Sequence, residues 1–167
     1  MIYDDDHYYM GGVMAELLIQ KGCRVTLVTP AAYVSEWTLN TLEQHEIHRR
    51  LANMGVTIEL NRGVTAIAKD HIVTNCMFTD MIRPLACDAV LLVYSRVENN
   101  SVYNELKQRE AEWAEAGIKS VKLIGDANAP GPIAWATYAG HRYARELDGN
   151  DIGDALPFRR EITQLAL

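Results

Sequence analysis

The stretch MIYDDDHYYMGGVMAELLIQKGCRVTLVTP, residues 1–30, decides the fold. Its opening residues, Met1–Asp5, are typical of a strand, and Arg24–Thr29 is a β-branched run of the kind found in buried parallel strands. Between them, residues 11–21 form a helix that ends at Gly22 and repeats its apolar residues at helical spacing, at Val13, Met14, Leu17 and Leu18. A strand, a helix and a second strand in this order form the opening unit of a doubly wound α/β fold.

The rest of the chain extends this unit. Three more helices are predicted, over Thr41–Met54 with capping-box spacing at Thr41 and Gln44, over Ser101–Ala116, and over Pro132–Leu147. Closely spaced β segments without helices between them predict an antiparallel meander, at Val56–Leu60, Val64–Ala68, Ile72–Phe78 and Ile82–Cys87. The apolar run Ala89–Tyr94 returns to the parallel sheet, and a right-handed crossover places a strand at Lys119–Ile124 beside it. The fold class is therefore α/β, a Rossmann-like three-layer fold with a mainly parallel sheet and an antiparallel meander.

Composition excludes several functional classes. The 167 residues carry a formal charge of −6, which disfavours nucleic-acid binding because phosphates need a basic face. The sequence has no apolar run long enough to span a membrane and an acidic rather than basic N-terminus, so neither a membrane protein nor a signal peptide is expected. The sequence has three scattered cysteines, Cys23, Cys76 and Cys87, which argue against a disulfide framework and for a cytoplasmic location. Because no C-x-x-C pair is present, no metal site is expected.

The first strand-to-helix turn departs from the dinucleotide-binding pattern G-x-G-x-x-G. Counting back from the second strand, Gly11 occupies the position of the third glycine, which allows close packing of helix and strand. Tyr8 then stands at the second glycine position and Asp6 at the first. A tyrosine obstructs the backbone's approach to a pyrophosphate, and the run Asp4–Asp6 repels an anion. The second strand also ends in Thr29-Pro30, without the acidic residue that holds a ribose hydroxyl. This pattern favours a fold retained for structure over a working nicotinamide site.

Several blocks, in one order along the whole chain, resemble the C-terminal region of trimethylamine, dimethylamine and histamine dehydrogenases and related N-demethylases. They are Asp4–Gly12, Tyr103–Lys107, Glu112–Ala114, Leu123–Ala127, Ala129-Pro130, Ala139–Arg142 and Pro157–Glu161. The resemblance implies a modular parent with an FMN-bearing (β/α)8 barrel, a 4Fe-4S cluster, and domains similar to the FAD and NAD(P)H domains of disulfide reductases. Residues 1–97 then match an NAD(P)-like unit with a degenerate glycine loop. Residues 98–167 match a crossover helix, a Gly-Asp strand and a final helix from the returning half of an FAD- or ADP-binding domain.

The same resemblance implies where a nucleotide would lie. Gly125, Asp126 and Ala127 correspond to the Gly-Asp motif beside the bound nucleotide, and Gly131 precedes the last helix, whose N-terminus faces phosphates. ADP is the nucleotide that this chain could hold. Gly11, the packing glycine of the first turn, is the fifth candidate cofactor-binding residue. The barrel, the cluster cysteines and half of the FAD-like domain are missing, so no catalytic residue is assigned and the chain alone is expected to be inactive.

Two kinds of function follow as hypotheses. In the first, the chain is a scaffolding, nucleotide-binding-like fragment of an amine dehydrogenase or N-demethylase whose chemistry takes place on the absent barrel, its main partner. In the second, it is a stand-alone, non-catalytic module that binds a nucleotide or a protein partner. A working NAD-dependent dehydrogenase is a third alternative, disfavoured by the glycine loop. Apolar surfaces uncovered by the missing parts are expected to favour a homodimer.

Overall fold

The structure is a computed structural model, and it describes residues 1–147 and residue 149. The predicted irregular tail and the family-like block Pro157–Glu161 therefore lie outside the described residues. The chain divides into two compact units, Met1–Arg96 and Val97–Leu167. No helix in the described part is long and apolar enough to cross a membrane.

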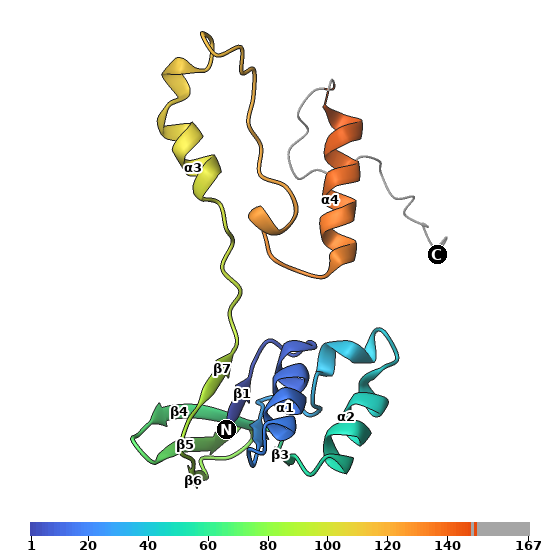
Figure 1. Ribbon diagram of the computed structural model, residues 1–167, viewed down its shortest axis with the longest axis vertical. Helices are drawn as coiled ribbons and strands as arrows, with labels where there is room; N and C mark the ends of the chain where they lie inside the picture. Colours follow the sequence, from blue (N-terminus) through green and yellow to red (C-terminus); the bar gives the residue numbers. More distant parts are fainter. Residues whose placement is uncertain (148, 150–167) are drawn as a thin grey trace, which may run out of the picture. The chain divides into compact units, whose positions relative to one another are not determined.

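The first unit is built on a parallel sheet of four short strands (Figure 1). The strands are β1 (Ile2–Asp4), β2 (Thr26–Val28), β3 (Thr57–Glu59) and β7 (Leu91–Val93), in the order β3-β2-β1-β7. All three pairings are parallel. The predicted return of the 89–94 run to the parallel sheet is confirmed, because Leu91–Val93 pairs with Ile2–Asp4.

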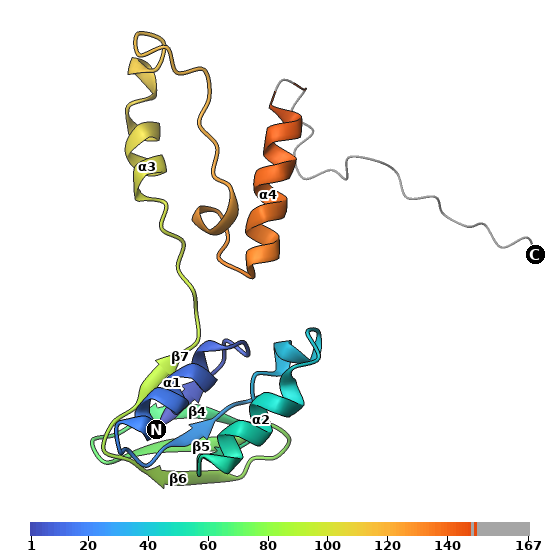
Figure 2. The same cartoon turned by 45° about the vertical axis from the view of Figure 1, so that its right-hand side comes forward.

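Two helices cover one side of this sheet. They are α1 (Met10–Gln20) and α2 (Gln44–Asn53), and Figure 2 shows them on the opposite side of the parallel strands from the three-stranded sheet. The core between strands and helices is aliphatic and closed to water, with Ile2, Leu27, Val34 and Leu51 completely buried. Burial of these side chains is the main term that stabilises the unit.

The antiparallel meander has three strands, β4 (Arg62–Ile67), β5 (His71–Cys76) and β6 (Ile82–Ala86), paired in the order β4-β5-β6. The prediction that Val56–Leu60 belongs to the meander was wrong. Those residues form β3, which extends the parallel sheet by pairing with β2. The mainly parallel α/β class with an antiparallel meander is confirmed.

The start of the second helix was also predicted incorrectly. A 3-10 turn at Glu36–Leu39 precedes it, and α2 begins at Gln44 after Glu43, which makes no side-chain cap. The amide of Gln44 donates instead to the carbonyl oxygen of Val34, and the hydroxyl of Thr41 contacts Thr38 and Glu43. The predicted capping box therefore does not form, because both side chains bind other partners.

The second unit has helices α3 (Ser101–Gln108) and α4 (Ile133–Glu146), with 3-10 turns at Glu110–Glu112 and Gly125–Ala127. The predicted third helix is shorter than expected, and the strand predicted at Lys119–Ile124 is wrong, since that segment pairs with no strand in the described part. Strands need a neighbour for their backbone N–H and C=O groups. None of the described residues from 97 to 147 is buried, so this unit has no core of its own there.

Candidate functional site

The turn between β1 and α1 is organised by the carboxylate of Asp4. This side chain is completely buried at the end of β1, and its Oδ1 accepts the backbone N–H groups of Asp6 and His7, each at 3.2 Å. Gly11 in the first turn of α1 lies directly against it: a Cβ added at Gly11 would stand 2.5 Å from Asp4 Oδ2. The structure therefore places Gly11 where only a glycine allows helix and strand to approach so closely.

The protein's own side chains fill the rest of this turn. Arg96 donates two hydrogen bonds to Asp6, from Nε at 2.8 Å and from Nη2 at 2.7 Å. The same guanidinium lies 5.8 Å from the ring centre of Tyr8, and Trp37 meets that ring edge-on. Loop N–H groups that would face a pyrophosphate in a dinucleotide-binding turn instead bind Asp4. This geometry supports the sequence argument against nicotinamide at this turn.

Burial also sets the ionisation of Asp4. Removal from water raises the pKa of this carboxyl, and the hydrogen bonds from His7 and Asp6 oppose the shift only in part. The second oxygen, Oδ2, is buried without a hydrogen-bond partner among the described residues. Relative to the unfolded chain, the folded protein therefore disfavours ionisation of Asp4, and the stability that Asp4 contributes is complete below the ordinary pKa of 3.8 and is lost as the pH rises through the raised pKa.

We expect Asp4→Asn to gain stability relative to the original protein as the pH rises from 3.8 through the raised pKa of Asp4, since asparagine cannot ionise. Urea unfolding at a series of pH values, followed through backbone hydrogen exchange in residues 1–30, measures this difference. Asp80→Asn, in an exposed turn, is the matched control and should show no such trend. A stability difference for Asp4→Asn that is the same at every pH would show that folding does not raise the pKa of Asp4.

The second candidate site lies in the second unit, at the Gly125–Ala127 turn. Gly125 adopts a φ of +56°, in the left-handed region that favours glycine, and its carbonyl oxygen accepts the N–H groups of Asn128 and Ala129. The Oδ1 of Asp126 accepts the backbone N–H of Gly131 at 3.3 Å. That bond closes the loop that leads into α4, so Gly125, Asp126, Ala127 and Gly131 lie together at one loop.

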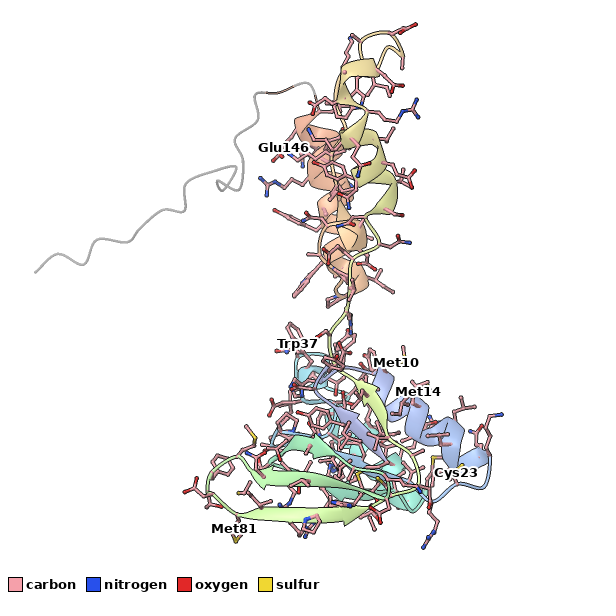
Figure 3. The ribbon with its side chains drawn as sticks, turned by 90° about the vertical axis from the view of Figure 1, so that its left-hand side faces the viewer. Met10, Met14, Cys23, Trp37, Met81 and Glu146 are labelled. Carbon is pink, nitrogen blue, oxygen red and sulfur yellow. The ribbon has the colours of Figure 1, made fainter. Side chains whose placement is uncertain are left out.

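A cavity of about 420 Å³ opens beside this loop. Its walls come from the segment before the turn and from one face of α4, and they include Lys122, Trp135, Arg142 and Tyr143. Arg142 Nε donates to the carboxylate of Glu146 at 2.9 Å, and Figure 3 shows Glu146 near the end of α4. Sequence reasoning did not assign Lys122 or Arg142 to the site, although Arg142 lies in the family-like block Ala139–Arg142.

The candidate metal-ligating side chains form no metal site among the described residues. No group of three or more histidine, cysteine or acidic side chains within the described residues is placed to hold a metal ion.

Sequence reasoning treated Asp4 only as a repulsive charge, although an aspartate before a turn commonly accepts the N–H groups two and three residues later. Arg96 could not have been found from spacing, because it lies 90 residues from its partner Asp6.

Comparison with known proteins gives the relationship of the chain. It superposes with a TM-score of 0.92 on the solved structure of histamine dehydrogenase from Rhizobium sp. 4-9, at 63% identity over 99% of this chain. It is also 30% identical to the dimethylamine dehydrogenase of Hyphomicrobium sp. (strain x), over 96% of this chain. The chain belongs to the trimethylamine, dimethylamine and histamine dehydrogenase family. The family resemblance that its sequence blocks predicted is therefore confirmed.

The chain spans about a quarter of the length of these relatives: 26% of the histamine dehydrogenase and 24% of the dimethylamine dehydrogenase. A third relative, the 6-hydroxypseudooxynicotine amine oxidase from Pseudomonas geniculata N1, matches with a TM-score of 0.77 and 33% identity. That match covers 84% of this chain and 21% of that protein. No protein-family model matches the sequence. The dehydrogenase family thus contains this chain as one part of much longer proteins.

Proposed function

We propose that this chain is the C-terminal, nucleotide-binding-like part of a flavin- and iron–sulfur-dependent amine dehydrogenase or N-demethylase. Its role there is to scaffold the enzyme and to hold ADP, while oxidation of the amine takes place on an FMN-bearing barrel outside this chain. The observation that carries the proposal is the cavity between the Gly125–Ala127 turn and α4, in a chain that aligns with amine-oxidising relatives over nearly its whole length.

ADP fits the chemistry of that cavity. Its volume lies within the range of about 300–1,000 Å³ that small-molecule sites occupy. Lys122 and Arg142 bring positive charge to its wall, which also carries the carboxylate of Glu146, the ion-pair partner of Arg142. The carboxylate of Asp126 holds Gly131 and so fixes the loop that enters α4. Of the residues that the family resemblance assigns to the nucleotide, Gly125 lines this cavity together with Lys122 and Arg142, whereas Asp126, Ala127 and Gly131 belong to the loop beside it.

FMN and the 4Fe-4S cluster would be bound by the rest of the polypeptide. The three cysteines of this chain are separated, and no metal-binding group forms among the residues that the structure describes. FMN would supply the acceptor for electrons from the C–N bond, and this chain's residues take no part in that step. Within this proposal the chain has no catalytic residue.

The test is a titration of the protein made from its complete natural gene with ADP and, separately, with NADH. We expect ADP to bind and Asp126→Ala to weaken its binding about fivefold, because the hydrogen bond that orders the loop is worth about 1 kcal/mol. Glu115→Ala, on the exposed segment after α3, is the matched control. Binding of NADH but not ADP, or equal ADP affinity in wild type and Asp126→Ala, would overturn the assigned site.

A further inference from the structure

Helix α1 carries a second apolar face that its own sheet does not cover. Its first face, formed by Gly11, Gly12 and Ala15, is buried against the strands and α2. The second face repeats at positions i, i+3, i+4 and i+7, and its residues Met10, Val13 and Leu17 are 54%, 56% and 42% exposed, with Met14 half-buried between them. A helix that is apolar on both faces is usually covered on both.

This second face borders an apolar groove. The α1–β7 groove, of about 650 Å³, has Met10 and Met14 of α1 on one wall and residues 91–94 in and after β7 on the other. Figure 3 shows the two methionines along α1. Tyr8, Tyr9 and the Asp6–Arg96 pair line it where the strands end. The side chains of the groove are therefore mainly apolar, with one polar end.

The position of β7 explains why the groove is open. Leu91 and Val93 pair in register with Ile2 and Asp4, so these four side chains point to the same side of the sheet, the side on which Asp4 meets Gly11. Helix α1 packs on β1 and α2 packs on α1. β7 is the edge strand and, among the described residues of this unit, it pairs with β1 alone; Val93 is buried, whereas Leu92 and Tyr94 next to it are 44% and 54% exposed.

We propose that the α1–β7 groove is the docking site for an amphipathic helix from another part of the same polypeptide. A helix fits better than a strand because one wall is itself a helix surface, and helices in one layer pack side by side at about 8–10 Å. The occupant comes from the same polypeptide because relatives of this fold are several times longer, with 74% of the histamine dehydrogenase chain lying outside the match (100% minus 26%). In this respect the inference rests on the proposed function.

Oxidation of the methionines by dilute hydrogen peroxide, measured by peptide mass spectrometry, tests the inference. The protein made from its complete natural gene is compared with the 167-residue chain. In the short chain, Met10 should react at a rate close to that of Met81, which is 64% exposed on the meander and labelled in Figure 3. In the complete protein, oxidation of Met10 and Met14 should slow by about tenfold, since a docked helix excludes the reagent.

Each other outcome overturns the inference in a recognisable way. If the complete protein is much longer and binds ADP, yet Met10 and Met14 react as in the short chain, the groove is open and only this inference fails. If the complete protein is no longer than this chain, no helix can be supplied and the proposed function fails as well. If protection appears in the short chain itself as its concentration rises, the occupant is a second copy.

Discussion

Replacing Gly11 with alanine is expected to destabilise the first unit by about 2–3 kcal/mol, the cost of forcing an extra carbon into a closed contact. The new Cβ would stand 2.5 Å from Asp4 Oδ2, 2.6 Å from its Cγ and 2.9 Å from its Cβ. Asp4 cannot easily move aside, because its side chain is short, buried and hydrogen-bonded to the turn. The helix would have to shift away from β1, which opens the aliphatic core.

The neighbouring glycine provides a matched control in the same helix turn. A Cβ added at Gly12 would meet Ile47, Leu51 and Ser35 at ordinary contact distances of 3.7–3.8 Å. We expect Gly12→Ala to be neutral or to stabilise the helix by up to about 1 kcal/mol, since alanine has the higher helix propensity. Urea unfolding followed by hydrogen exchange in residues 1–30 measures both variants. Equal stability of Gly11→Ala and Gly12→Ala would show that β1 and α1 do not approach as closely as described.

Gly11 also shows how far the sequence predicts this fold. Its position between an apolar strand and an apolar helix was enough to predict the unit and the close packing. The role of Asp4 had a weaker signal, because an aspartate before a turn can accept the N–H groups that follow it or can repel a bound phosphate, and the residue type alone does not separate the two roles. Arg96 is beyond any spacing rule, since its ion pair with Asp6 depends on β1 and β7 being neighbours in the sheet.

The errors have a common physical origin. Val56–Leu60 was assigned to the meander because it precedes other short strands, yet parallel pairing of Thr57–Glu59 with β2 places it in the parallel sheet. The strand predicted at Lys119–Ile124 has the right local pattern but no neighbour within the described residues. Local patterns predict which residues can form strands, whereas pairing depends on partners that a local pattern does not contain. The site residues around Gly125 came from family resemblance, and their role in nucleotide binding remains a prediction.

The exposure of the second unit supports the other prediction with a large expected effect. We expect the natural protein to be several times larger than this chain and to contain flavin. None of the described residues from 97 to 147 is buried, and Val97, Ile133 and Tyr138 are 83%, 83% and 61% exposed. A segment that buries no apolar side chain cannot offset the entropy lost on ordering its backbone. The segment therefore needs other residues to cover it, and the relatives, of which this chain spans about a quarter, carry the matching segment within longer proteins.

The most direct test is the mass and absorption spectrum of the natural protein, purified from its source cells with an antibody raised against this chain. A polypeptide several times heavier than 18.7 kDa, with the visible absorption of flavin and an iron–sulfur cluster, is the result that the proposed function predicts. A colourless protein of about 18.7 kDa would contradict it and would leave a stand-alone binding module as the function of this chain.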